Sequence, residues 1–149
     1  NNKLNNLRDR KNQVRTSQQT IAKRYCEISK LNYCDTLYTS FLNERDRIII
    51  TRWRLSSHLL RVETGRYKTP AIPRERRLCF ICRVVEDETH SIFHCTAHKF
   101  IRFRNRDMLS KFNTVSDILC PKSVQEASAI ANYLRDIESN MITLKMIDK

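Results

Sequence analysis

The sequence predicts a mainly α-helical fold, a small helical domain that ends in a long C-terminal amphipathic helix. Three observations support this prediction. The chain has 149 residues but a single glycine, Gly65, whereas the turns of β-rich domains depend on glycine. After Ser123 the apolar residues recur at steps of three and four, the spacing of one helix face. Four of the five cysteine and histidine residues at positions 79–95 have a spacing that predicts a CCHC zinc knuckle inside the small domain.

Positive charge is in excess and unevenly distributed. The chain has 28 Lys and Arg against 16 Asp and Glu, a formal net charge of +12. Residues 1–76 hold 17 of the basic and 7 of the acidic side chains. A surplus in one half of a chain indicates a polyanionic partner, RNA or DNA first and an acidic membrane surface second. A basic surface that only keeps the protein in solution is the alternative.

Several classes of protein are excluded by composition. The longest apolar run, Ile48–Ile50, is far shorter than the roughly 20 residues of a transmembrane helix. No apolar segment opens the chain, so we expect a nuclear or cytoplasmic protein rather than a secreted one. No glycine-rich loop is present to hold a nucleotide's phosphates, which excludes the P-loop and Rossmann patterns.

The N-terminal part divides into a leader and a helical region. Residues 1–15 are polar and lack apolar periodicity, which predicts a flexible leader or linker. A helical region with a basic face is predicted over residues 16–65. Its first helix starts near Ser17, with apolar residues at steps of four, three and three. These residues are Ile21, Tyr25, Ile28 and Leu31.

A second helix of this region is predicted to begin at the N-cap Asn43, with Glu44 in its first turn, and to end in a left-handed cap at Gly65. Its apolar stripes are Ile48, Leu55, Leu59 and Val62, and beside them Ile49, Trp53 and Leu60. The opposite face of this helix carries basic residues seven positions apart, Arg47, Arg54 and Arg61. One side of this helix is therefore expected to face a core and the other to face anions.

The remaining chain is predicted in three parts, a basic extended connector over 66–78, the knuckle with a following helix over 79–104, and a helical tail over 105–149. Two prolines keep the connector from forming a helix. Guanidinium groups bind phosphates, and a tyrosine between cations can stack on a base, although ordinary packing of that ring is the alternative. The predicted nucleic-acid-binding residues are Arg47, Arg54, Arg61, Arg66, Tyr67, Lys68, Arg74, Arg76 and Arg77.

The knuckle reads C-x2-C-x7-H-x4-C, with Cys79, Cys82, His90 and Cys95 as the predicted ligands of a Zn²⁺ ion. Zinc prefers four such ligands in a tetrahedron, and a C-x2-C pair supplies two thiolates from one tight turn. Four protein ligands leave no open position, so the ion is predicted to be structural rather than catalytic.

Three other interpretations of the cysteines stay open. His94 and His98 can replace His90 and Cys95, which gives C-x2-C-x11-H-x3-H. Six cysteines can also form disulfides, or can be small buried apolar residues. Cys26, Cys34 and Cys120 lie outside the knuckle and are expected to be core residues.

Residues 51–104 resemble the C-terminal region of non-LTR (LINE-type) retrotransposon reverse transcriptases. The shared elements are the RLSSHLL helix, the ETGRY turn, the PRERRLC approach, the C-x2-C-x7-H-x4-C knuckle and the EDETH approach to His90. The short arginine-bearing helix after Cys95 also matches, whereas the helix after Ser123 fits the family's tail more loosely.

The resemblance implies a zinc-stabilised module that holds template RNA or target DNA during target-primed reverse transcription, beside upstream reverse-transcriptase domains of the same polyprotein. No Y-x-D-D string occurs and 54 residues follow Cys95, so polymerase and nuclease catalysis are expected elsewhere. No catalytic triad is readable around the histidines, and we expect no enzyme activity in this chain alone. The alternative is a structural or protein-interaction tail that buttresses the polymerase without touching nucleic acid. Arginines that face solvent favour the first function, and arginines paired with acidic neighbours favour the second.

Overall fold

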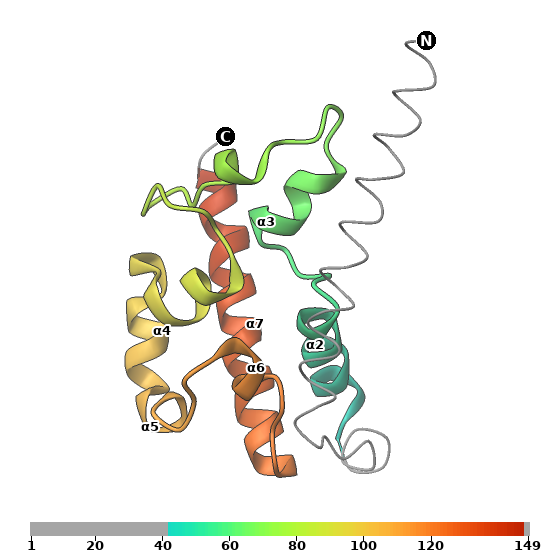
Figure 1. Ribbon diagram of the computed structural model, residues 1–149. Coiled ribbons are helices and arrows are strands. Elements are labelled where there is room, and N and C mark those ends of the chain that lie inside the picture. Colours follow the sequence, from blue (N-terminus) through green and yellow to red (C-terminus); the bar gives the residue numbers. More distant parts are fainter. Residues whose placement is uncertain (1–41, 148–149) are drawn as a thin grey trace.

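A computed structural model describes residues 42–147 of the chain (Figure 1). The predicted leader over 1–15 and the helix predicted from Ser17 lie outside the described residues. The α-helices of the described residues are α2 (Glu44–Arg54), α3 (Arg61–Thr64), α4 (Lys99–Arg104), α5 (Arg106–Leu109), α6 (Val115–Ile118) and α7 (Val124–Ile147). Short 3-10 turns, η2 (Gly65–Tyr67), η3 (Arg74–Arg76) and η5 (Thr96–His98), and a π-helical turn, η4 (His90–His94), lie between them.

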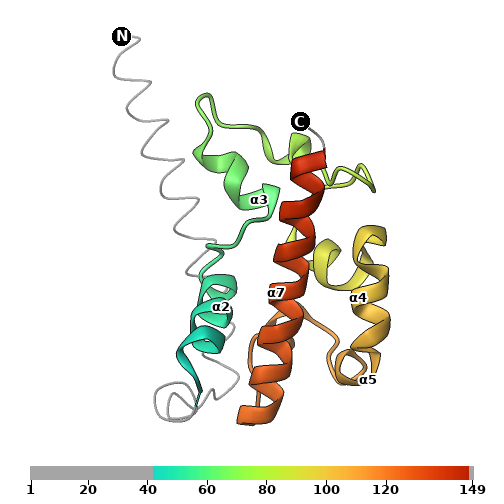
Figure 2. The ribbon, with the colours of Figure 1, turned by 180° about the vertical axis from the view of Figure 1, so that it is seen from behind.

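The described part of the chain is mainly α-helical, as the sequence predicts. Between residues 42 and 147 the β-structure is a single isolated bridge, which pairs Leu78 with Val85. Helix α7 runs through the middle of the molecule, with α2 and α3 on one side and α4 and α5 on the other (Figures 1 and 2). Within the same residues, none of the helices combines the length and the apolar character needed to cross a lipid bilayer.

Helix α7 confirms the predicted C-terminal amphipathic helix. The Ser123 hydroxyl accepts a hydrogen bond from the Glu126 amide at 3.1 Å, and the Glu126 carboxylate accepts one from the Lys122 amide at 2.6 Å. The Glu126 amide belongs to the set that a helix N-terminus leaves without partners, and the Lys122 contact holds the chain that enters the helix. The buried face of α7 consists of Ala127, Ile130, Ala131, Tyr133, Leu134, Ile137, Glu138 and Met141.

The core lies where this face of α7 meets α2 and α6. Ile50 and Trp53 from α2 and Ile118 from α6 are completely buried against it. Burial of one such side chain stabilises the fold by about 1.5–3 kcal/mol. The Trp53 indole also donates a hydrogen bond of 3.1 Å to the Glu138 carboxylate of α7, so its polar atom is satisfied inside the core.

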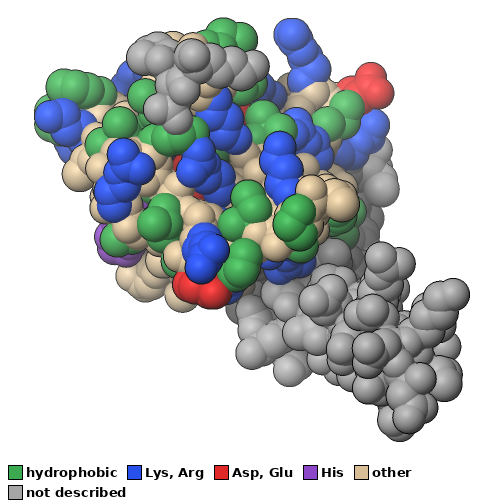
Figure 3. All heavy atoms as spheres, turned by 90° about the horizontal axis from the view of Figure 1, so that it is seen from above, with side chains coloured by type: hydrophobic (Ala, Val, Ile, Leu, Met, Phe, Trp, Pro, Cys, Tyr) green, Lys and Arg blue, Asp and Glu red, His purple; other side chains and the backbone are tan. Residues whose placement is uncertain are grey.

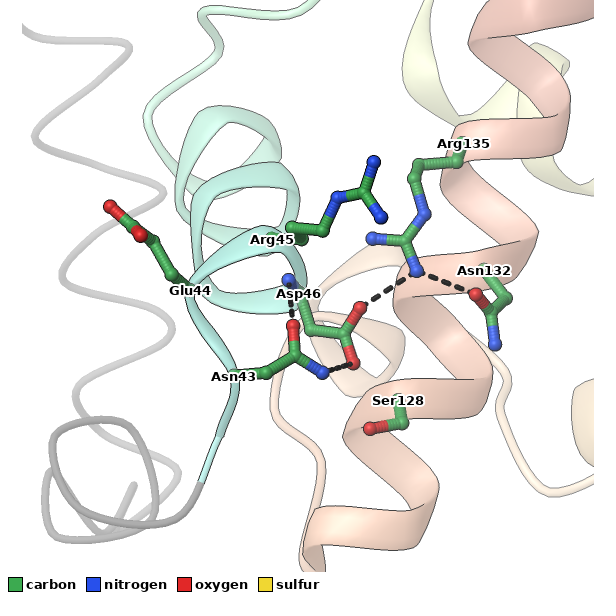
Figure 4. A pocket seen from close by; sticks show the side chains of 7 residues that line it. All are labelled: Asn43, Glu44, Arg45, Asp46, Ser128, Asn132 and Arg135. Atoms are coloured by element: carbon green, nitrogen blue, oxygen red, sulfur yellow. Dashed lines mark hydrogen bonds and ion pairs between the residues drawn. The ribbon is translucent and has the colours of Figure 1, made fainter.

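A polar contact fixes the first turn of α2 to α7 (Figure 4). Asn43 caps α2 as predicted, because its side-chain oxygen accepts the Asp46 amide at 2.9 Å. The buried Asp46 carboxylate accepts hydrogen bonds from Asn43 at 2.8 Å and from Arg135 of α7 at 2.7 Å. Burial alone would raise the pKa of Asp46, but the hydrogen bonds from Arg135, Ser128 and Asn43 lower it below its ordinary value.

The prediction of one continuous helix from Asn43 to Gly65 is wrong. Helix α2 ends at Arg54, and Ser56 adopts a left-handed conformation with φ of 52°. The Ser56 amide donates to the Trp53 carbonyl at 3.3 Å and the Ser57 amide to the Arg52 carbonyl at 2.7 Å. This pair of bonds is a Schellman motif, in which a serine takes the place that glycine usually occupies.

Gly65 therefore serves a purpose other than the predicted left-handed cap. Its φ is −69°, a conformation open to any residue. A Cβ atom at this position would lie 2.8 Å from Cδ of Arg77. The glycine is required because the Arg77 side chain crosses its backbone at a distance that leaves no room for a side chain.

Candidate metal centre

The first half of the centre is a tight turn that presents two sulfur atoms. The Cys79 amide donates to the Val84 carbonyl at 2.7 Å, and the Arg83 amide donates back to the Cys79 carbonyl at 3.1 Å. Arg83 takes a left-handed conformation with φ of 58°, which closes the turn. The bridge between Leu78 and Val85 holds the two ends of the turn together. Cys79 and Cys82 thus lie within one hairpin-like knuckle.

The second half is the π-helical turn η4. The Asp87 carboxylate accepts the His90 amide at 2.9 Å at the start of this turn. The Cys95 amide donates to the His90 carbonyl at 2.7 Å, five residues back, and ends it. The spacing of His90 and Cys95 is visible in the sequence, but no residue pattern there indicates the π-helical geometry that joins them.

The four predicted ligands come together in space. Their ligand atoms all lie within 4.8 Å of one another. Sγ of Cys95 is 3.7 Å from Sγ of Cys79 and 3.9 Å from Sγ of Cys82. Two sulfurs bound to one ion at 2.3 Å in a tetrahedron are about 3.8 Å apart, so these distances fit a tetrahedral metal site.

The histidine completes the donor set. His90 is buried, and its Nε2 atom is buried without a hydrogen-bond partner among the described residues. A buried polar atom normally has a partner, and a metal ion is the partner that an imidazole nitrogen beside three thiols can have. The residues present therefore fit a metal ion held by three sulfurs and one nitrogen.

The electrostatics of the thiols differ along the cluster. Burial, together with the neighbouring Cys79, raises the pKa of Cys95 to about 12. Burial also acts against the Cys82 thiolate, but hydrogen bonds from the Thr96 hydroxyl at 3.1 Å and the Thr96 amide at 3.3 Å lower the pKa of Cys82 overall. Burial lowers the pKa of His90, which keeps its imidazole neutral. A bound cation reverses the penalty on the thiolates, since it replaces their repulsion with attraction.

The alternative set with His94 and His98 is not brought together in the described residues. His94 is exposed, and Nδ1 of the buried His98 lies 3.0 Å from the Asn140 amide nitrogen. Burial, with Arg102 and His90 nearby, lowers the pKa of His98 to about 4. Cys79, Cys82 and Cys95 form no disulfide, and Cys120 packs at the edge of the core as expected. Cys26 and Cys34 lie outside the described residues.

Two residues of α7 that sequence analysis did not single out hold the centre against the core. The Tyr133 hydroxyl donates to the Ile92 carbonyl inside η4 at 2.5 Å. The Asn140 side chain donates to the Ala97 carbonyl at 3.0 Å, just after Cys95. Tyr133 and Asn140 are seven residues apart and therefore share a helix face. The seven-residue spacing is the only feature of the sequence that indicates a shared role for Tyr133 and Asn140.

Three of the predicted nucleic-acid-binding arginines donate hydrogen bonds to backbone carbonyls within the fold. The guanidinium of Arg54 is buried and donates to the Leu119 carbonyl at 2.7 and 2.5 Å. Arg61 donates to the Leu78 carbonyl at 3.0 Å, and its Cζ atom lies 3.4 Å from the centre of the Phe80 ring. The predicted stripe with Arg47 is therefore wrong, because the helix that would align the three residues ends at Arg54.

Arg77 also turns inward. Its guanidinium donates to the Ile72 carbonyl at 2.7 Å and the Val62 carbonyl at 2.6 Å. Arg66 pairs with the buried Glu63 carboxylate at 3.2 Å.

The connector over 66–77 keeps part of its predicted basic character. Lys68, Arg74 and Arg76 are exposed, and Arg74 pairs with Asp87 at 3.1 Å. Tyr67 is 79% exposed, which contradicts ordinary packing of its ring and leaves the ring available. His58, in contrast, is packed inside the fold, where its Nε2 atom lies 2.9 Å from the Glu88 carboxylate.

Comparison of the chain with protein-family models, with curated proteins and with solved structures finds no match.

Proposed function

We propose that this chain is a zinc-stabilised nucleic-acid-binding module, the C-terminal part of a non-LTR retrotransposon reverse-transcriptase polyprotein. In this proposal Cys79, Cys82, His90 and Cys95 hold Zn²⁺, and basic surface residues hold template RNA or target DNA. The metal organises the segment around it and takes no part in a reaction, because all four of its positions belong to protein ligands.

The chemistry of the donor set supports zinc among the metals. Three thiols and one imidazole are soft and borderline donors, which zinc accepts and magnesium or calcium does not. The sulfur spacing of 3.7 and 3.9 Å supports the same assignment, since zinc favours a tetrahedron with sulfurs about 3.8 Å apart.

The distribution of charge between surface and interior carries the nucleic-acid proposal. Residues 42–147 contain 19 Lys and Arg and 12 Asp and Glu. Five of these acidic residues are buried, but only one of the basic residues is. The buried acidic residues are Asp46, Glu63, Glu86, Glu88 and Glu138. The excess of basic over acidic residues is therefore larger at the surface than in residues 42–147 as a whole. A surface with such an excess attracts a polyanion.

The connector places part of this charge at one end of the molecule. Residues 66–77 lie at the top of Figure 1, and Figure 3 views that end from above. Lys and Arg side chains alternate there with hydrophobic side chains, and acidic side chains are few. Lys68, Arg74 and Arg76 with the exposed Tyr67 ring supply cations and an aromatic face, the combination that single strands bind.

The second candidate is a structural or protein-interaction tail, and the inward arginines favour it. Arg54, Arg61 and Arg77 donate to backbone carbonyls and stabilise the fold. These contacts explain part of the arginine content without nucleic acid.

The test is binding of the chain to fluorescent single-stranded RNA, duplex DNA and an RNA–DNA hybrid over a salt series, with zinc content measured in parallel. Each phosphate contact contributes a log–log slope of about −0.7 to −0.9. The triple variant Lys68→Ser, Arg74→Ser and Arg76→Ser should flatten the slope by about two to three.

A matched control keeps the change in net charge the same. Arg45, Lys111 and Lys122 are exposed and lie away from the connector, so their triple serine variant should bind like the parent. If the parent binds none of the three ligands, the tail function replaces nucleic-acid binding. If both triple variants keep the parental salt slope, the connector is not the binding surface.

A further inference from the structure

Helix α4 exposes two aromatic rings on its outer surface. Phe100 is 75% and Phe103 66% exposed, among the most exposed large apolar side chains between residues 42 and 147. They are three residues apart in one helix, so their Cβ atoms are about 5–6 Å apart. Ile101, between them, turns inward and packs against the core. The phenylalanines thus occupy positions that the packing of α4 does not use.

Cations lie over both rings. Nζ of Lys99 is 4.9 Å from the centre of the Phe100 ring, and Cζ of Arg106 is 4.7 Å from the centre of the Phe103 ring. A cation over an aromatic face is attracted by the ring quadrupole, by about 0.5–1 kcal/mol at an exposed site. Each ring therefore has a cation over one face and leaves most of its surface to solvent.

The metal centre and α7 fix α4 in place. Helix α4 begins four residues after the ligand Cys95, and the Asn140 side chain of α7 holds the intervening turn. At the other end the Arg104 guanidinium pairs with Asp136 of α7 at 2.5 Å. The helix that carries the two rings is thus held by contacts with α7 at both ends, which lowers the conformational entropy that a stacking ligand must remove.

The charge of this segment identifies the partner. From Lys99 to Arg106 the chain reads KFIRFRNR, which holds four cations and no acidic residue. Each exposed ring is thus flanked by basic side chains. A ligand that has flat apolar rings joined by anionic groups is complementary to this arrangement.

We propose that Phe100 and Phe103 form a stacking platform for two unpaired bases of a single-stranded nucleic acid, with Lys99 and Arg106 beside the phosphates. This inference rests on the proposed nucleic-acid function and specifies it, because only a strand with unpaired bases exposes faces that can stack on the rings.

The test compares the parent with the double variant Phe100→Ala and Phe103→Ala in binding three fluorescent probes of equal length. The probes are a uridine RNA strand, a thymidine DNA strand, and a DNA strand with abasic positions throughout. Base stacking on an aromatic side chain changes affinity by roughly 5- to 150-fold per base. The double variant should therefore lose at least about 25-fold on the two strands with bases and almost nothing on the abasic strand. The RNA and DNA strands show which sugar is preferred.

Three further variants separate stacking from other causes. The double variant Phe100→Tyr and Phe103→Tyr should keep parental affinity. The double variant Phe100→Leu and Phe103→Leu should lose it, because leucine keeps the apolar surface and lacks a ring. Ile142→Ala with Met146→Ala is the matched control, since these exposed residues also lie one turn apart, on α7, and their loss should leave binding unchanged.

The outcomes distinguish the two proposals. If the parent binds no nucleic acid, duplex included, the proposed function fails and the platform fails with it. If the parent binds strands with and without bases equally, or the leucine variant binds like the parent, the platform is wrong while the basic surface stands. Circular dichroism and zinc content of every variant confirm that each one is folded.

Discussion

The two flanks of α7 are stabilised by different means. On one side α2 packs Ile50 and Trp53 against α7 in a continuous apolar core. On the other side residues 78–98 contribute few core residues, and their sharp turns converge on three thiols and an imidazole. The order of the first flank follows from apolar periodicity, whereas we propose that a metal ion offsets the entropy of ordering the second. Each flank should therefore respond to a different perturbation.

The largest expected effect is loss of the metal. Structural zinc contributes on the order of 10 kcal/mol of apparent binding free energy in small zinc domains. A chelator, or His90→Ala, should abolish tight zinc binding and remove hydrogen-exchange protection from residues 78–98. Protection in α7 should survive, because its apolar face packs against α2 and α6.

His94→Ala is the control for this prediction, since His94 is exposed and should leave zinc content unchanged in native mass spectrometry. Parental zinc binding by the His90 variant, or uniform loss of protection across both flanks, would contradict the comparison.

The second prediction perturbs the apolar flank. Ile137→Ala removes a completely buried side chain of α7 and should lower the free energy of unfolding by about 2–5 kcal/mol. Denaturant unfolding measures this loss, and native mass spectrometry should still find one zinc per folded chain. Ile142→Ala, at an exposed position of the same helix, should change stability by less than about 0.5 kcal/mol. A zinc-free Ile137 variant under native conditions would show that the flanks are not separable.

The third prediction concerns the arginine between α2 and α6. Arg54→Ala leaves the buried Leu119 carbonyl without its donor, which costs about 1–3 kcal/mol. Affinity for nucleic acid should stay at the parental value, because the side chain is buried. The exposed Arg76→Ala should do the opposite, with unchanged stability and weaker binding. Weaker nucleic-acid binding by a folded Arg54 variant would contradict this prediction and would support the binding role that the sequence predicted for Arg54.

The fourth prediction tests the crossing of Arg77 over Gly65. Gly65→Ala places a Cβ atom 2.8 Å from the Arg77 side chain and should cost about 1–3 kcal/mol, as overpacking does. In an Arg77→Ala background the same change should cost little, so the two effects are not additive. Additive losses in urea unfolding would mean that Gly65 is needed for another reason.

The smallest expected effect is at low pH. Since hydrogen bonds lower the pKa of Asp46 in the fold, its contribution is fully present above the pKa of an unfolded aspartate, about 3.9. The contribution is lost as pH falls through the lower folded pKa, at about 1.4 kcal/mol per unit of pKa shift. Asp46→Asn should therefore reduce the fall in stability below about pH 4. An acid-unfolding curve with an unchanged slope in this variant would refute the role.

The sequence was sufficient where structure depends on neighbours in the chain. The cap at Asn43, the α7 face and the ligand spacing are all local patterns, and each is confirmed. It was not sufficient where a distant partner decides. Arg54 is buried because it donates to the Leu119 carbonyl, 65 residues away in the sequence. Glycine is needed at position 65 because the Arg77 side chain lies against it. Apolar residues at helical spacing also continue past Ser56, although the backbone there is left-handed. No residue type at this position indicates that conformation, so the end of α2 could not be predicted.

Helix α7 also determines how the two flanks are oriented toward each other. Its 24 residues make a rod about 36 Å long. Glu138 accepts the Trp53 indole on one flank, and Asn140, two residues later, holds the turn after Cys95 on the other. Two residues correspond to about 200° of helical rotation, so these contacts leave nearly opposite sides of one helical turn. Both flanks are thus attached at the same level of α7, and any twist of α7 there reorients α2 and the turns that carry Cys79, Cys82, His90 and Cys95 together.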